Sequence, residues 1–411
     1  MERAGLARLL GGGVATHGGR PVMIAESDPE KFRTAFARAV AGSAEIFLCD
    51  PGWGAVERAQ VEALLRAGTG PGSGAEKLPR KEGGWLMIPT GGTSGRVRFA
   101  RHDAATLAAA VRGFTRHFSI PQVNAVGLLP LHHVSGLMGW MRCALTGGEY
   151  RPLEWKAIEA GALPAMSAKP HGWVISLVPT QLGRLLRSER TADWLANFRT
   201  ILLGGGPAWP GLLEQAARRR LPLAPGYGMT ESAAMVAALR SEEFLAGARS
   251  CGAVLPHVTL KIGEEGAISI GGDSLFRGYY PDWRTDDEYM TSDAGWLDER
   301  GHLHVTGRRD SVIITGGEKV DPVEVEAVLR GSGEFIEVVV LGMPDAEWGQ
   351  VVIAAYPETE RPNLDKVQAA ITRLLSPAKR PKRFVAVANW PANSQGKVNR
   401  AEVARRASLN L

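Results

Sequence analysis

The sequence of 411 residues predicts an α/β protein with a large N-terminal domain and a small α+β C-terminal domain. The large domain is expected to contain parallel-sheet βαβ layers and a small β-rich piece. The chain is too long for one ordinary core, so two or three structural units are expected. Short apolar runs alternate with helical stretches over about the first 240 residues, which is typical of βαβ units. The pattern changes near Gly252 and again near Asp310.

The first pattern contains short apolar runs that are expected to be strands and longer stretches that are expected to be helices. The expected strands are Ile46–Cys49, Trp85–Pro89, Ala125–Leu129, Trp173–Val178 and Ile201–Leu203. The expected helices are Ala104–Phe118 and Gly211–Arg219. Strands that alternate with helices in this way are expected to form a parallel sheet.

The two later changes mark the β-rich piece and the C-terminal domain. The β-rich piece is expected to contain the strands Val258–Ile262, Ala267–Ile270 and Leu303–Val305. Beyond Asp310 the expected elements are the helices Val323–Leu329 and Asn363–Leu375 and the strands Glu337–Leu341 and Val352–Tyr356. A compact unit of about 100 residues can fold as a separate domain. We therefore predict domains at 1–309 and 310–411.

Composition narrows the class of protein. Hydrophobic residues make up 45% of the chain and charged residues 22%, as is typical of a soluble globular protein. The net charge of +5 is mild: it suits anionic small substrates, and a solvated basic surface is the favoured explanation. Nucleic acid is not a predicted partner. Cys49, Cys143 and Cys251 form no CxxC motif, which fits a reducing cytoplasm. No apolar run reaches the roughly 18 residues that span a bilayer, and no membrane span is expected.

A segment rich in glycine and hydroxyl groups follows the apolar strand that ends at Pro89. Its sequence is Thr90-Gly91-Gly92-Thr93-Ser94-Gly95-Arg96-Val97-Arg98. Backbone N–H groups and hydroxyls in such a loop can converge on phosphate oxygens, and Arg98 can add charge. The segment is not a Walker A loop. Taken alone, an ordinary Gly-rich turn explains it equally well.

Two further segments have the composition of a nucleotide site. Tyr227-Gly228-Met229-Thr230-Glu231 places a carboxylate beside a hydroxyl, and Mg²⁺ prefers such oxygen ligands. A Thr-Glu pair also begins many helices. Gly204-Gly205-Gly206-Pro207 follows an apolar strand and permits a flat ring to approach the backbone. A flexible strand-to-helix turn is an equal explanation for these glycines.

Two single residues complete the set of candidates. Asp293 can accept hydrogen bonds from both hydroxyls of a ribose, as acidic residues do in other nucleotide sites. Lys397 lies in a polar segment close to the C-terminus. Taken alone, Asp293 is explained by a turn and Lys397 by solvation.

Each segment alone is a weak signal, but the set of segments in this order indicates a particular protein family. From about Trp85 to Arg400 the sequence resembles the adenylate-forming superfamily of acyl-CoA synthetases, luciferases and peptide-synthetase adenylation domains. The segments that resemble family motifs are Thr90–Gly95 (phosphate loop), Leu129–His133 (acyl pocket), Gly204–Pro207 (adenine), Tyr227–Glu231 (Mg²⁺ and phosphate), Thr291–Asp293 (ribose), Gly307–Asp310 (hinge) and Gly396-Lys397 (catalytic lysine).

The resemblance implies an ATP-dependent, AMP-forming acid–CoA ligase that uses ATP, Mg²⁺ and coenzyme A. It implies that Glu231 binds Mg²⁺, that Thr230 contacts the α-phosphate and that Lys397 bridges the acid and the α-phosphate. The residues expected to bind the nucleotide are Thr90, Gly91, Gly92, Thr93, Ser94, Gly95, Arg98, Gly204, Gly205, Gly206, Pro207, Tyr227, Gly228, Met229, Asp293 and Arg308.

The resemblance also implies a mobile C-terminal domain. Rotation about the hinge residue Asp310 is expected to replace Lys397 at the site by the loop that contains Gly316 and Gly317, for the coenzyme A stage. The expected partners are small molecules, namely a carboxylic acid, ATP and coenzyme A. A homodimer is left open.

Within the family, Pro130–Gly136 and Ser176–Leu182 look most like the 2-succinylbenzoate–CoA ligases of menaquinone and phylloquinone biosynthesis. Their acid has two carboxylates, and Arg142 is the expected partner of the aromatic one, directly or through water. An Arg snorkelling at a helix edge is the alternative. His133 is expected to line the acyl pocket and take part in catalysis, Ser135 to donate a hydrogen bond there, and His132 to be structural.

The sequence departs from the family pattern at two places. Val97-Arg98 stands where the phosphate loop usually ends in Pro-Lys, and Ser292 replaces the usual Gly of the ribose motif. Other functions also stay open. They are a ligase for another carboxylic acid, an enzyme that charges a carrier-protein thiol, and a catalytically silent nucleotide-binding protein.

Overall fold

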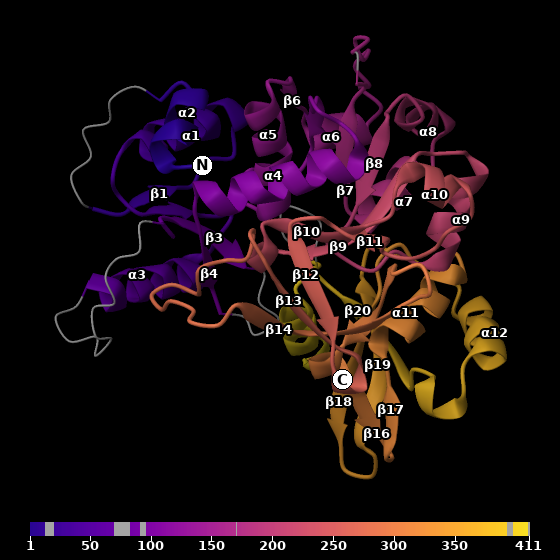
Figure 1. Cartoon of the computed structure of the whole chain (residues 1–411). Helices are drawn as coiled ribbons and strands as arrows, with labels where there is room; N and C mark the ends of the chain where they lie inside the picture. Colours follow the sequence, from indigo (N-terminus) through magenta and orange to yellow (C-terminus); the bar gives the residue numbers. More distant parts are fainter. Residues whose placement is uncertain (13–19, 70–82, 91–95, 170, 393–397, 410–411) are drawn as a thin grey trace.

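The computed structural model describes residues 1–12, 20–69, 83–90, 96–169, 171–392 and 398–409. The chain forms a large N-terminal unit and, below it in Figure 1, a smaller unit in orange and yellow. Among the described residues, no helix combines the length and the apolar character needed to cross a membrane. The α/β class predicted from the sequence is confirmed, with mixed sheets in the large unit and a small α+β unit after them.

The N-terminal part of the chain builds a four-stranded sheet. Its strands, in sheet order, are β1 (Val22–Ile24), β2 (Ile46–Leu48), β3 (Leu86–Thr90) and β4 (Arg98–His102). The first three are parallel, and β4 is antiparallel to β3. The helices of this part are α1 (Arg3–Leu9), α2 (Pro29–Ala41) and α3 (Ala55–Thr69). The described residues before Trp85 therefore form a layer together with β3 and β4.

A seven-stranded sheet forms the centre of the large unit. Its order is β11 (Ala253–Val254), β10 (Ala234–Ala238), β9 (Leu223–Met229), β8 (Thr200–Leu203), β7 (Val174–Leu177), β5 (Ala125–Gly127), β6 (Tyr150–Pro152). The strands from β9 to β6 are parallel, whereas β10 and β11 are antiparallel. The helices here are α4 (Ala104–Phe118), α5 (Val134–Thr146), α6 (Trp155–Glu159), α7 (Pro179–Leu185), α8 (Glu189–Leu195), α9 (Pro210–Arg218) and α10 (Ser241–Leu245).

Helix α4 shows how the sequence sets these elements. Asp103 caps its start, because the carboxylate accepts a hydrogen bond from the Thr106 backbone N–H at 2.9 Å. Leu107, Val111 and Phe114 then follow at helical spacing and are buried. The helix has the bounds predicted from the sequence. The predicted strands also form, although several begin or end between one and four residues from the predicted positions.

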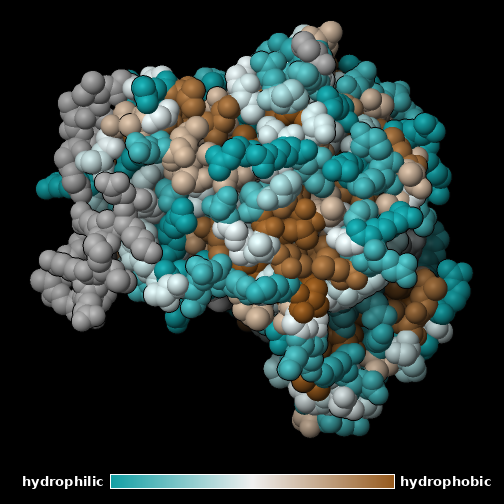
Figure 2. Space-filling view, viewed as in Figure 1, coloured by the Kyte–Doolittle hydropathy of each residue, from teal (hydrophilic) through white to brown (hydrophobic). Residues whose placement is uncertain are grey.

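The β-rich piece is an antiparallel sheet of four strands. They are β12 (Val258–Ile262), β13 (Ala267–Gly272), β14 (Glu288–Leu297) and β15 (Leu303–Arg308). In Figure 2, apolar side chains gather near the middle of the visible face, in the region of β10–β13. This sheet packs against the central one through a shared apolar cluster that includes Val236, Ile268 and Phe276.

The elements from β16 onward make up the smaller unit, which has its own apolar clusters. Its elements are β16 (Ile313–Thr315), β17 (Glu318–Val320), α11 (Pro322–Gly331), β18 (Val339–Asp345), β19 (Gly349–Pro357), α12 (Leu364–Leu374), β20 (Arg383–Val387) and α13 (Arg400–Ser408). The three-stranded sheet has the order β18-β19-β20. Arg184 of α7 pairs with Glu337 across the junction with the large unit, at 2.6 Å.

Candidate active site

The segment from Tyr227 to Glu231 lies at the carboxyl end of β9, which is the end where parallel sheets bind ligands. At Gly228 the neighbouring strand comes very close, since a Cβ there would lie 1.8 Å from the Ala234 carbonyl oxygen. Glycine therefore permits the tight pairing of β9 with β10. A single 3-10 turn, Thr230–Ser232, then carries the hydroxyl and the carboxylate.

A buried histidine fixes the backbone at Thr230. The imidazole of His102, at the end of β4, lies with Nε2 at 2.8 Å from the Thr230 carbonyl oxygen and Nδ1 at 3.1 Å from Thr106 Oγ1. A carbonyl can only accept, so Nε2 carries the hydrogen. Burial lowers the pKa of His102 from its ordinary 6.5 to about 4. The ring is therefore neutral at pH 7 and holds this turn.

A tyrosine fixes the carboxylate of Glu231. Glu231 is buried, and its Oε1 accepts a hydrogen bond from the Tyr279 hydroxyl at 2.5 Å. The hydroxyl of Tyr289 lies 2.9 Å from that of Tyr279. The guanidinium of Arg98 stacks on the Tyr279 ring at 4.4 Å from its centroid. Tyr279 thus links the predicted metal ligand to a residue that flanks the predicted phosphate loop.

The electrostatics at Glu231 fit a bound cation. Within the described part of the chain, no Lys, Arg or His lies at ion-pair distance from its carboxylate. Burial and the nearby Glu231 raise the pKa of Tyr279, so the phenol stays protonated and remains a donor. A buried carboxylate without a protein cation is costly unless a ligand supplies the charge. Oxygen ligands of this kind suit Mg²⁺.

Asp293 belongs to the same site. It lies in β14, and its Oδ2 accepts a hydrogen bond from the Tyr227 hydroxyl at 2.7 Å. Arg308 at the end of β15 lies 4.0 Å from the other carboxylate oxygen. The Arg308 guanidinium also makes two hydrogen bonds to Asp310, at 2.8 and 2.6 Å. The predicted ribose residue and the predicted hinge residue therefore share Arg308.

Gly204 to Pro207 follow β8, next to the end of β9. Gly205 has φ +80°, which favours glycine, and a Cβ at Gly206 would meet no atom within 4 Å. Gly205, Gly206 and Pro207 are exposed. A flat ligand can therefore reach this backbone beside the Tyr227 segment.

The predicted phosphate loop and catalytic lysine are described only at their edges. Thr90 and Arg98 pair with each other across β3 and β4, so they flank the loop. The Oγ1 atom of Thr90 is buried without a hydrogen-bond partner among the described residues. Gly91, Gly92, Thr93, Ser94 and Gly95 lie outside the described residues, as do Gly396 and Lys397.

The predicted acid-pocket residues lie along α5. His133 is the residue that precedes the helix, and Ser135 is in its first turn. Seven residues separate Ser135 from Arg142, which places both on one face about 10 Å apart. Arg142 is 5% exposed, and its guanidinium lies 4.3 Å from the centroid of the Phe114 ring. It is buried within the molecule, which contradicts the alternative of a snorkelling side chain at a helix edge.

Arg142 is a buried cation without an anionic partner in the described part of the chain. Its Nε atom likewise has no hydrogen-bond acceptor there. Burial lowers its pKa to about 10, so it remains charged at pH 7. An unpaired buried guanidinium costs several kcal/mol, on the order of a buried ion's desolvation penalty. An anion or an ordered water is therefore the expected complement.

Gly316 and Gly317 lie away from this site. They form the turn between β16 and β17, at the end of the smaller unit that is remote from the large unit (Figure 1). The backbone N–H of Gly316 donates a hydrogen bond to the Trp348 carbonyl at 2.9 Å. In this arrangement the predicted coenzyme A loop does not face Glu231.

Two residues that hold the site, His102 and Tyr279, were not predicted from the sequence. His102 and Tyr279 touch Thr230 and Glu231 from more than 40 positions away in the sequence, because the fold brings β4 and the segment after β13 to the end of β9. No local motif marks His102. For Tyr279 the sequence offers only a weak indication of a role in the site: the residue follows the Arg277-Gly278 pair between two predicted strands.

Comparisons with known proteins agree with this geometry. Residues 23–280 match the model of the AMP-binding enzyme family, and residues 324–397 match that of the AMP-binding enzyme C-terminal domain. The chain therefore belongs to the AMP-binding enzyme family.

Two curated relatives share a name. The 2-succinylbenzoate–CoA ligase of Enterococcus faecalis is 31% identical over 76% of this chain and 67% of its own length. That of Listeria monocytogenes serovar 1/2a is 35% identical over 68% of this chain and 61% of its own length. The chain thus spans about two thirds, or somewhat less, of these relatives.

Solved structures of o-succinylbenzoate CoA synthetase from Bacillus subtilis have the same fold. The complex with the acyl-adenylate OSB-AMP has a TM-score of 0.76 at 22% identity and covers 98% of this chain and 91% of its own. The complex with ATP and magnesium ion has a TM-score of 0.75 at 22% identity and covers 97% and 92%. At this identity the likeness concerns the fold.

Replacing His102 by Gln tests the buried histidine. Unfolded, His102 takes up a proton near pH 6.5, but folded it does so only near pH 4. The free energy of unfolding therefore falls as pH drops through this window, by on the order of 3 kcal/mol. Gln keeps a donor for the Thr230 carbonyl but does not titrate. We expect a shallower pH slope for His102→Gln in denaturant unfolding. An equal slope contradicts this role, and His171→Gln at a partly exposed site is the control.

Proposed function

We propose that the chain is an ATP-dependent 2-succinylbenzoate–CoA ligase, which forms o-succinylbenzoyl-CoA, AMP and pyrophosphate for menaquinone or phylloquinone biosynthesis in the cytoplasm. The observation that carries the proposal is the buried Arg142, which has no anionic partner among the described residues and lies on the face of α5 that also holds Ser135. An acid with a second carboxylate supplies the anion that this cation lacks. Family membership and the curated relatives support the same reaction.

The nucleotide is assigned to the ends of β8, β9 and β14. Gly204–Pro207 accept the adenine ring, and Asp293, held by Tyr227, accepts hydrogen bonds from the ribose hydroxyls. Thr230 contacts the α-phosphate. Thr90 and Arg98 contact the outer phosphates together with the loop between them. Glu231 holds Mg²⁺, which when bound neutralises phosphate charge.

In the first half-reaction an oxygen of the succinyl carboxylate bonds to the α-phosphorus, and the bond to pyrophosphate breaks. Pyrophosphate leaves with the electron pair, and the acyl-adenylate remains. The chain contributes position and charge rather than a covalent group. Lys397 is assigned, from its place in the sequence, to the negative charge that develops between acid and α-phosphate. His133 and Ser135 position the acid.

In the second half-reaction the thiolate sulfur of coenzyme A attacks the acyl carbon, and AMP leaves. We assign this stage to a rotation of the domain 310–411 about Asp310. Rotation of the domain about Asp310 must break or rearrange the two hydrogen bonds from Arg308 to Asp310. The rotation brings Gly316 and Gly317 from the remote end of the smaller unit to the site.

The acid preference of wild type and of Arg142→Met tests the proposal. We expect wild type to support ATP–pyrophosphate exchange best with 2-succinylbenzoate, among acids that include benzoate, hexanoate and the analogue without the ring carboxylate. Arg142→Met should lose about 100-fold or more with 2-succinylbenzoate and little with the analogue, because only the former needs the cation. Its melting temperature should stay equal or rise, since an unpaired buried charge is removed.

The controls separate function from folding. Arg112→Met, at an exposed position of α4, should change neither activity nor melting temperature. A wild-type preference for benzoate or hexanoate contradicts the assigned acid and favours a ligase for another acid. Equal losses for Arg142→Met with both acids contradict the role of Arg142. Thioester formation on a carrier protein but not on coenzyme A contradicts the assigned acceptor.

The contact between Arg184 and Glu337 generates a second prediction. It joins the two units in an arrangement that keeps Gly316 away from the site. A second contact joins the same units, because the Arg330 guanidinium lies 5.5 Å from the centroid of the Trp209 ring. Glu337 is buried, but Arg184 is partly exposed, so the pair is worth about 1 kcal/mol. We expect Arg184→Ala to slow adenylate formation about fivefold relative to thioester formation, in single-turnover measurements of each step. Arg187→Ala is the nearby control, and an unchanged ratio contradicts the assignment.

A further inference from the structure

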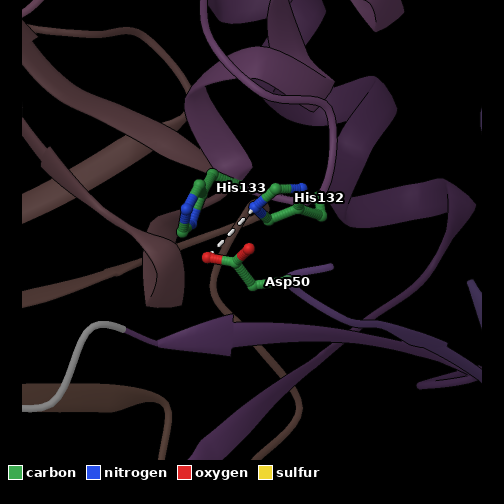
Figure 3. A group of neighbouring side chains, drawn as sticks. All are labelled: Asp50, His132 and His133. Atoms are coloured by element: carbon green, nitrogen blue, oxygen red, sulfur yellow. Dashed lines mark ion pairs between the residues drawn. The ribbon is translucent and has the colours of Figure 1, made fainter. Parts of the chain in front are cut away.

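Asp50, His132 and His133 form a compact cluster beside the site but outside the nucleotide residues. Asp50 follows β2, and the two histidines precede α5, so the cluster joins the first sheet to the central part of the large unit. One ligand atom from each side chain lies within 4.8 Å of the others. Figure 3 shows the carboxylate of Asp50 turned toward the two imidazoles.

The spacing between Asp50 and His132 is closer to that of two metal ligands than to that of a strong hydrogen bond. Asp50 Oδ2 and His132 Nε2 are 3.6 Å apart, whereas a charge-assisted N–H···O bond spans about 2.7–2.9 Å. Two ligand atoms bound tetrahedrally to Zn²⁺ at about 2.0–2.1 Å lie roughly 3.3 Å apart. The histidine ring centroids are 4.4 Å apart, with a tilt of 48°. Small rotations of the three side chains are enough to bring one ligand atom from each into contact with a single ion.

The surroundings hold these side chains in place. The other oxygen of Asp50, Oδ1, accepts a hydrogen bond from the Gly52 backbone N–H at 2.8 Å, which turns Oδ2 toward the imidazoles. Such an outer contact orients a ligating carboxylate. His132 is 3% exposed, and the adjacent Leu131 and Cys49 are also buried. The cluster is therefore partly desolvated, which strengthens metal binding.

We propose that Asp50, His132 and His133 bind one Zn²⁺ ion, with water in the fourth position. Two imidazoles and one carboxylate match the ligand set of open zinc sites. The imidazole donors favour Zn²⁺ and related transition metals over Mg²⁺, which prefers oxygen ligands. The site is distinct from Glu231, which is assigned to Mg²⁺. His133 is also assigned to the acid pocket, so the ion would lie beside the bound acid. The binding of the ion is measured without any acid, so its test does not depend on which acid the protein activates.

A titration with Co²⁺, the spectroscopic substitute for Zn²⁺, tests the site. Full-length protein is stripped with a chelator, and no ATP or acid is added. We expect one equivalent of Co²⁺ to give the visible absorption of a tetrahedral centre, and Zn²⁺ to displace it. Asp50→Asn is nearly isosteric, removes the anionic ligand, and should raise the dissociation constant at least about tenfold. His132→Gln should do the same, with folding checked by circular dichroism.

Two matched controls sharpen the result. Asp298 and His304 form a pair at 3.1 Å in the β-rich piece, so Asp298→Asn removes a carboxylate from a His–Asp pair outside the cluster and should leave binding unchanged. Glu231→Gln should also leave it unchanged. The proposal is overturned if wild type shows no tetrahedral Co²⁺ signal, if Asp50→Asn binds as tightly as wild type, or if the spectrum shows cobalt–thiolate charge transfer.

Discussion

The hydrogen bond from Tyr279 to Glu231 is the contact on which the rest of the candidate site depends. It joins the end of the central sheet to the segment after β13. The Tyr279 ring also packs against the guanidinium of Arg98, which flanks the predicted phosphate loop. His102 holds the adjacent Thr230 carbonyl from the first sheet. Three separately built parts of the large unit therefore meet at the turn that carries Thr230 and Glu231.

The large unit carries two buried charges that it does not neutralise among its described residues. Glu231 is an anion held by a neutral phenol, and Arg142 is a cation packed on Phe114. Each lowers stability, and stability is commonly exchanged for function at such places. Opposite ligand charges, a metal cation at Glu231 and a second carboxylate at Arg142, relieve both. This charge complementarity is the physical reason to expect an acid with a second carboxylate and a magnesium nucleotide as the ligands.

Local patterns predicted much of the fold and part of the site. Helix α4 has the predicted bounds because its cap and its apolar spacing both lie within the helix. Tyr227 and Asp293 were predicted separately as nucleotide residues, and the fold joins them. His102, Tyr279 and Asp50 were missed, because their partners are distant in sequence and long-range contacts leave no local pattern. Lys397 remains a prediction, since it lies outside the described residues.

Calorimetric binding of ATP with and without Mg²⁺ tests the central claim most directly. We expect wild type to bind MgATP at least tenfold more tightly than free ATP, and Glu231→Gln to lose most of that difference, because the ligand that holds the metal is gone. Tyr279→Phe should fall between the two, since it removes the contact that orients the carboxylate. A magnesium dependence that is the same in wild type and Glu231→Gln would contradict the account.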